Sequence, residues 1–141
     1  MNWKLLFISA TFAIMQSGCS TDPTLSELKF GLPAIETGKG RIFFYRDQNV
    51  RVIYAPDITV NGEIVGPVPH HKDMFYKDVL PGVYSVKTKA AKEQIQVAIT
   101  EGQREYVRFK YSGTGYGMYP ELVERSIGAS ETQGMAFIGS R

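Results

Sequence analysis

Apolar and polar positions alternate along three successive segments of the chain, residues 82–88, 94–99 and 104–111. In the first of them, Tyr84 and Val86 are separated by polar residues. A period of two places alternate side chains on opposite faces of a strand. Because only short turns join the segments, the pattern predicts an antiparallel meander with one buried face and one face in water.

Residues 40–46 (GRIFFYR) follow a different pattern, with four consecutive apolar side chains. Continuous apolar runs are typical of strands that are covered on both faces. The run therefore predicts a central strand.

The clearest hairpin signal lies at Asn61-Gly62, within residues 57–68. A two-residue type I′ turn needs positive φ at both central residues, which Asn and Gly tolerate best. This turn predicts that Thr59 lies opposite Ile64 and Ile58 opposite Val65. It places Ile58, Val60 and Val65 on one face, which we expect to be buried.

With further strands at 73–79 and 121–126, the chain has about seven or eight short strands, which indicates an all-β fold, an antiparallel β-sandwich. We expect the domain to span residues 38–126. The last residues, 127–141, contain several Gly and only a weak helical spacing, so we expect a partly disordered or loosely docked tail.

Composition excludes some function classes. Hydrophobic residues make up 43% of the chain and charged residues 21%, as in ordinary globular domains. The net charge is only +2, and there is no arginine-rich run, so nucleic-acid binding is not expected.

The N-terminus has the layout of an export signal. Lys4 precedes the uncharged, mostly apolar run LLFISATFAIM, and small residues follow. A membrane-spanning helix needs about 20 apolar residues, and this run is well short of that. Residues 1–18 are therefore predicted to be a cleaved signal peptide.

Cys19 is the single cysteine of the chain, so it can form no intramolecular disulfide. Its position directly after Ser17-Gly18 resembles the lipobox of bacterial lipoproteins, although Gln16 stands where that motif usually has Leu. The resemblance implies that Cys19 carries fatty acyl chains such as palmitate, which anchor the protein without a spanning helix. Ser20, which is not Asp, implies an outer-membrane lipoprotein facing the periplasm.

Residues 19–37 would then be the tether between the lipid and the domain. Asp22 and Pro23 are a plausible N-cap and first helical residue, so a short helix is expected up to about residue 30.

The polar face of the predicted meander is basic. The functional interpretation is a docking surface for an envelope protein, an anionic lipid or a cell-wall polymer, and the alternative is an ordinary solvated sheet face. Residues 112–120, rich in Gly and Tyr, are either a binding loop or a simple hairpin end. The candidate binding residues are Lys87, Lys89, Arg104, Tyr106, Arg108 and Lys110, with Gln94 and Gln96 beside them.

No catalytic set emerges from the sequence. His70, His71 and Asp73 are weak metal-ligand candidates, because adjacent residues on an extended chain point apart. No Ser stands in a nucleophile-elbow motif. We therefore expect a non-catalytic protein without a cofactor; the alternative is a metal-dependent or carboxylate-based enzyme that uses the segment 70–73.

Four stretches in order, GKGRIFFYR, PDITVNGEIVG, FYKDVLPGVYSVKT and EGQREYVRFKY, resemble an uncharacterised family of bacterial lipoproteins, domain-of-unknown-function family 2846. The resemblance runs from about residue 28 to 123. It implies an envelope location and a sandwich fold. Because the family has no established activity, the resemblance implies no catalytic or binding residue.

Overall fold

The computed structural model describes residues 31–113 and 117–141. The predicted signal peptide (1–18), the lipidation site Cys19 and the short helix expected before residue 30 lie outside the described residues. The strands and the helix given below all fall within the two described ranges.

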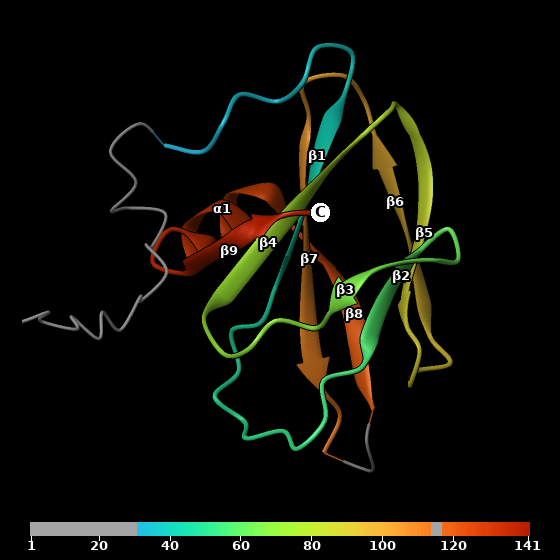
Figure 1. The fold of residues 1–141 in the computed structure, drawn as a ribbon, viewed down its shortest axis with the longest axis vertical. Helices are drawn as coiled ribbons and strands as arrows, with labels where there is room; N and C mark the ends of the chain where they lie inside the picture. Colours follow the sequence, from blue (N-terminus) through green and yellow to red (C-terminus); the bar gives the residue numbers. More distant parts are fainter. Residues whose placement is uncertain (1–30, 114–116) are drawn as a thin grey trace, which may run out of the picture.

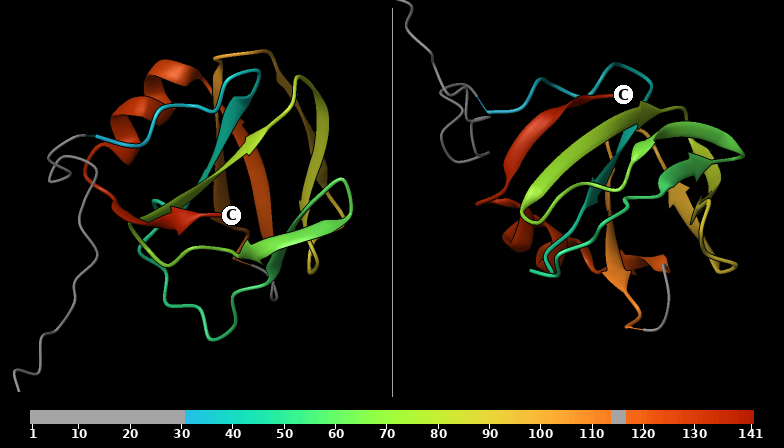
Figure 2. Two further views of the ribbon diagram at one scale, coloured as in Figure 1. Left: turned by 45° about the horizontal axis from the view of Figure 1, so that its top comes forward. Right: turned by 60° about the horizontal axis from the view of Figure 1, so that its bottom comes forward.

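Two β-sheets pack face to face, and a helix covers the outer side of one of them (Figures 1 and 2). Sheet A has the strand order β8-β7-β1-β4-β9 and sheet B the order β3-β2-β5-β6. This arrangement confirms the predicted all-β sandwich. The elements are β1 (Gly40–Tyr45), β2 (Asp57–Val60), β3 (Glu63–Pro67), β4 (Asp73–Val79), β5 (Gly82–Thr88), β6 (Gln94–Ile99), β7 (Arg104–Tyr111), β8 (Met118–Val123), α1 (Arg125–Thr132) and β9 (Ala136–Ser140).

Strand β1 is central in sheet A and is buried on both faces, as its apolar run predicts. Ile42 and Phe44 point into the core between the two sheets. Phe43 and Tyr45 point into a second core on the other side of sheet A, under α1. The domain therefore has three layers, which are sheet B, sheet A and helix α1 (Figure 2).

The Asn61-Gly62 turn has the predicted geometry, with φ of 49° and 86° at the two residues. Thr59 lies opposite Ile64 as expected, but Ile58 lies opposite Gly66 instead of Val65. The register shifts between Ile58 and Thr59, because a bulge inserts an extra residue, which the turn rule does not foresee. The three side chains predicted to share one face, Ile58, Val60 and Val65, are nevertheless all buried.

The predicted three-stranded meander is wrong in its last step. Strands β5 and β6 pair along all of β6, but β7 leaves sheet B and runs in sheet A between β1 and β8. The backbone carbonyl of Gln103 accepts a hydrogen bond from Arg41 at 2.8 Å, which aligns the start of β7 with β1. Alternation fixes which side chains share a face, but it does not choose the neighbouring strand.

The predicted domain end at residue 126 is also wrong, because the expected tail is folded. It contains most of α1 and then β9, which pairs in parallel with β4 and forms one edge of sheet A (Figure 1). Met135 is 4% exposed and Phe137 packs against the second core. A few apolar side chains spread over a Gly-containing segment give little periodic signal, yet they suffice to dock it on a core that already exists.

The chain enters the domain along residues 31–39, where the start of the folded part is fixed by a buried arginine. Arg41, 1% exposed, donates hydrogen bonds to the carbonyl oxygens of Pro33 at 2.7 Å and Ala34 at 3.3 Å. The same guanidinium forms two hydrogen bonds with Asp78, at 2.6 and 2.9 Å, and lies 3.6 Å from the centre of the Tyr76 ring. Bidentate pairing of this kind fixes both partners in position.

Candidate functional site

The residues predicted as one basic face lie in two different sheets. Lys87 belongs to β5, and Lys89 follows that strand, so both are in sheet B. The other four candidates, Arg104, Tyr106, Arg108 and Lys110, belong to β7 in sheet A. The predicted single face is therefore wrong, because β7 does not pair with β6.

Helix α1 covers part of the β7 candidates. Tyr106 is only 6% exposed and belongs to the second core, with its ring stacked on that of Phe43 at a centroid distance of 4.8 Å. Burial raises the pKa of the Tyr106 hydroxyl above its ordinary value. Arg104, at the start of the strand, stays exposed.

Arg108 is surrounded by acids that come from three other parts of the chain. It pairs with Glu121 of β8 at 2.9 Å, Glu131 of α1 at 2.6 Å and Asp47 after β1 at 3.4 Å. Lys110 also pairs with Glu121, at 2.9 Å. We call these five residues the Arg108 cluster. The acids of this cluster pair with Arg108 and Lys110, two of the residues predicted to form the basic face.

The electrostatics of the Arg108 cluster follow from these contacts. Hydrogen bonds from Lys110 and then from Arg108 hold the pKa of Glu121 below its ordinary value, against the opposing effect of burial. The fully buried hydroxyl of Tyr45 donates a hydrogen bond to Glu131 at 2.6 Å. Burial, together with this bond, raises the pKa of Tyr45. The cluster ties α1 to sheet A, and its charges are engaged with one another.

Sequence reasoning missed Asp47 and Glu131 because they lie 61 and 23 residues from Arg108 in the chain. Glu121 lies opposite Arg108 in the β7–β8 hairpin. No local spacing indicates that Glu131, within the expected tail, meets Arg108. The sequence did contain a signal for the Arg41–Asp78 pair. An arginine inside a strand that is otherwise apolar requires a buried partner, since an unpaired buried charge is strongly destabilising.

The part of the predicted face that remains open is the outer face of sheet B. Lys87 and Gln94 lie opposite each other, as do Ser85 and Gln96, in the register of β5 and β6. Two aliphatic side chains on this face are largely exposed, Ile64 at 55% and Val83 at 63%. We call it the sheet B surface, and its exposed residues are Ile64, Val83, Lys87, Gln94, Gln96 and Ala98.

The sheet B surface carries much less charge than the basic candidates on β7. Lys87 is its single charged side chain, and the nearby Lys89 pairs with Asp57 at 3.4 Å. A mostly uncharged, partly aliphatic sheet face is better suited to protein contact than to a polyanion. Of the surfaces that the sequence predicted, this one is the candidate for binding.

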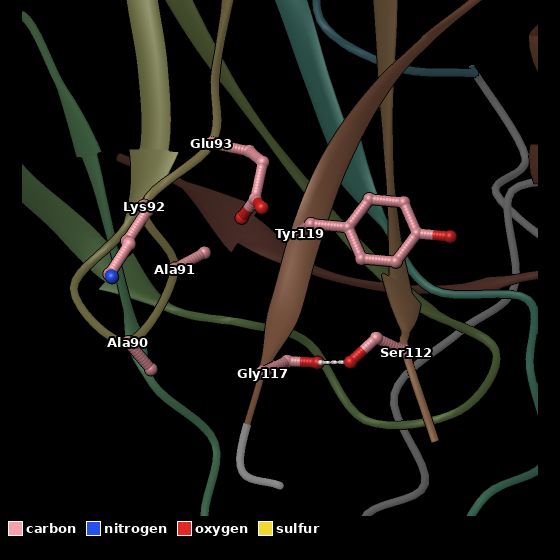
Figure 3. A pocket seen from close by; sticks show the side chains of 7 residues that line it. All are labelled: Ala90, Ala91, Lys92, Glu93, Ser112, Gly117 and Tyr119. Carbon is pink, nitrogen blue, oxygen red and sulfur yellow. Dashed lines mark hydrogen bonds between the residues drawn. The ribbon is translucent and has the colours of Figure 1, made fainter. Parts of the chain in front are cut away.

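A hollow of about 480 Å³ lies where the β5–β6 turn approaches the β7–β8 hairpin (Figure 3). Lys92 and Glu93 line it from the turn, and Ser112 donates a hydrogen bond to the Gly117 carbonyl on the hairpin side. In Figure 3 the ring of Tyr119 lies on the opposite side of β8 from Lys92 and Glu93. The ring therefore does not face these two charges, and the lining lacks convergent groups for a defined ligand.

The histidine candidates lie in the turn before β4. His70 is exposed and His71 is half-buried, with its Nδ1 buried and without a hydrogen bond. Within residues 31–113 and 117–141, no group of three or more His, Cys, Asp or Glu side chains is placed to hold a metal ion. No helix among these residues is long and apolar enough to cross a membrane.

Residues 36–117 match the model of a protein family described as "Protein of unknown function (DUF2846)". The match covers β1 to β7 and more than half of the chain. No curated protein and no solved structure matches the chain. The four stretches that resembled this family in the sequence all lie within the matched range.

Proposed function

The chain belongs to the DUF2846 family, and from this membership together with its N-terminal sequence we propose that it is a lipid-anchored envelope protein of bacteria. Its β-sandwich is a non-catalytic binding or structural module that faces the periplasm from the outer membrane. Cys19 carries the lipid. The membrane is thus one partner, and a second is an envelope protein that contacts the sheet B surface.

The observation that carries the proposal is the setting of Cys19. It follows an uncharged apolar run and two small residues, and it precedes the start of the folded part. Because Arg41 fixes residues 33 and 34 to the domain, the tether between the lipid and the sandwich ends before them. A short tether suits a domain that works close to a membrane.

Palmitate labelling in cells tests the anchor. The wild-type chain should incorporate the label and remain in the membrane fraction, whereas Cys19→Ser should do neither. A change of Gln16→Leu, which restores the usual lipobox residue, should give at least as much label as the wild type. Label retained by Cys19→Ser would refute the anchor.

Cross-linking in cells tests the binding surface. A photoreactive residue at Val83, on the sheet B surface, should give a defined adduct with an envelope protein. The same residue at Gln133, exposed beyond α1, is the matched control and should give none. Adducts of equal yield at both positions would remove the sheet B surface from the proposal.

A further inference from the structure

The two sheets end in four edge strands, and three of these carry features that discourage pairing with another chain. Pro120 interrupts β8, and Pro67 ends β3, whose pairing with β2 is shifted by a bulge. Strand β9 pairs irregularly with β4 and contains Gly139 at a φ of 124°. Proline, bulges and irregular short strands are the usual protections of a sheet edge.

Strand β6 has none of these protections. Its six residues, Gln94–Ile99, include no Pro, no Gly and no charged side chain. All six pair with β5 in an unbroken register. No strand of the described chain pairs with β6 on its other side.

The backbone groups that β6 leaves unpaired can be identified from the ladder. The Ser85 carbonyl accepts a hydrogen bond from Asn61, at 2.9 Å, so the backbone of Ser85 faces β2. In an antiparallel ladder the direction alternates, so Tyr84 and Val86 face β6. Their partners on β6 are Val97 and Ile95. The N–H and C=O groups of Gln94, Gln96 and Ala98 therefore point away from β5.

We propose that β6 pairs antiparallel with β6 of a second copy of this chain, about a two-fold axis at Gln96. In this register Gln96 lies opposite Gln96, and Gln94 of each copy lies opposite Ala98 of the other. Every outward N–H and C=O of the three residues then has a partner. The two B sheets join into one continuous sheet of eight strands.

The side chains of β6 are compatible with this self-pairing. The exposed residues that meet across the axis are uncharged, so no like charges lie opposite each other. Ile95, half-buried in a single copy, falls opposite Val97 of the second copy on the apolar face. An isologous contact of this kind closes as a dimer.

The oligomeric state tests the proposal. The full chain with Cys19→Ser lacks the proposed lipid, so the outcome is independent of the proposed anchor. By light scattering after size exclusion, this chain should be a dimer. Gln96→Lys should make it a monomer, because it places two ammonium groups opposite each other. Gln96→Pro should do the same, because it removes an outward N–H without touching the β5 ladder.

Val83→Lys is the matched control. It adds the same charge to the same face, but on β5, one strand away from the axis, so it should leave the dimer intact. Circular dichroism tests whether each variant is folded. If Gln96→Pro does not fold, the result for Gln96→Lys decides the test. A monomeric parent chain, or a dimer that survives Gln96→Lys, would overturn the proposal.

A thiol cross-link tests the register. In the Cys19→Ser background, Gln96→Cys provides one thiol on each copy, with the two Cα atoms about 5.5 Å apart in a hydrogen-bonded pair. Ala98→Cys provides thiols about 14 Å apart, because each lies opposite residue 94 of the other copy. A short bifunctional reagent should join the first pair and not the second. Equal yields, or a reversed preference, would refute this pairing.

Discussion

Gly128 of α1 lies directly on the ring of Tyr106 in β7. A Cβ atom at Gly128 would come within 3.0 Å of Cβ, Cγ and Cδ1 of that tyrosine, closer than real Cβ atoms approach. Glycine at this position therefore sets the distance between the helix and sheet A. It also explains why Tyr106, a candidate for solvent contact in the sequence, is a core residue.

We predict that Gly128→Ala destabilises the domain. Alanine has the higher helix propensity, by about 1 kcal/mol, but the overlap with Tyr106 should outweigh it and give a net loss of about 1–3 kcal/mol. Urea unfolding measures the change. Gly134→Ala is the matched control, because nothing lies within 4 Å of a Cβ there, and it should change stability by less than about 0.5 kcal/mol. Equal effects at both positions would contradict the close approach.

Asp78 should make stability fall in acid. Its hydrogen bond from Arg41 is the main cause that lowers its pKa below the ordinary 3.8. A carboxyl whose pKa is lower in the folded state contributes stability at pH values above its unfolded pKa. That contribution is lost as the pH falls through the folded pKa. The unfolding free energy of the wild type should therefore decrease below about pH 4.

Asp78→Asn should remove this part of the acid dependence and lower the stability near neutral pH, since it leaves Arg41 buried without its charged partner. Chemical unfolding at a series of pH values measures both effects. Asp57→Asn is the control, because that carboxylate is far more exposed and pairs with the exposed Lys89. If Asp78→Asn kept the full acid dependence of the wild type, the Arg41–Asp78 pair would not be its source.

Arg108 should matter more for stability than Lys110, although both lie on one face of β7. Arg108→Met removes the cation shared by three carboxylates and should cost on the order of 2 kcal/mol. Lys110→Met removes a single, more exposed pair and should cost less than about 1 kcal/mol. Hydrogen exchange should show faster opening of α1 in Arg108→Met. Equal costs for the two variants would mean that the Arg108 cluster does not hold the helix.

Thr88 should contribute to the contact between the two sheets. Its fully buried hydroxyl donates a hydrogen bond to the Met118 carbonyl at 2.6 Å, which joins the end of β5 to the start of β8. Thr88→Val keeps the shape but removes this donor and the acceptor of the Ala91 N–H, so it should cost about 1–3 kcal/mol. Thr59→Val is the control, since its hydroxyl reaches its acceptor only at 3.5 Å. A larger loss at Thr59 than at Thr88 would contradict this role.

The positions of β1 to β7 could be predicted from the sequence, but not all of their neighbours, and β9 was not predicted. The apolar run of β1, the alternation in β5, β6 and β7 and the Asn61-Gly62 turn are local signals, because side-chain direction and turn geometry depend on adjacent residues. The partner of β7 is a long-range choice. One face of β7 carries Val107, Phe109 and Tyr111, which pack in the core between the sheets, and Tyr106 on the other face is buried under α1 in the second core.

The same division holds for the candidate site. In the sequence, Lys87, Arg108 and Lys110 are all basic residues at the polar positions of strands in which apolar and polar residues alternate. The fold separates them, because Glu121 and Glu131 reach Arg108 from β8 and α1 while Lys87 stays in water. Strands β1 to β7, the hairpin turn and the setting of Cys19 could be recognised in the chain itself, since each depends on neighbouring residues. Which charges are neutralised and which sheet edge stays open depends on elements far apart in the chain, and only their packing brings these together.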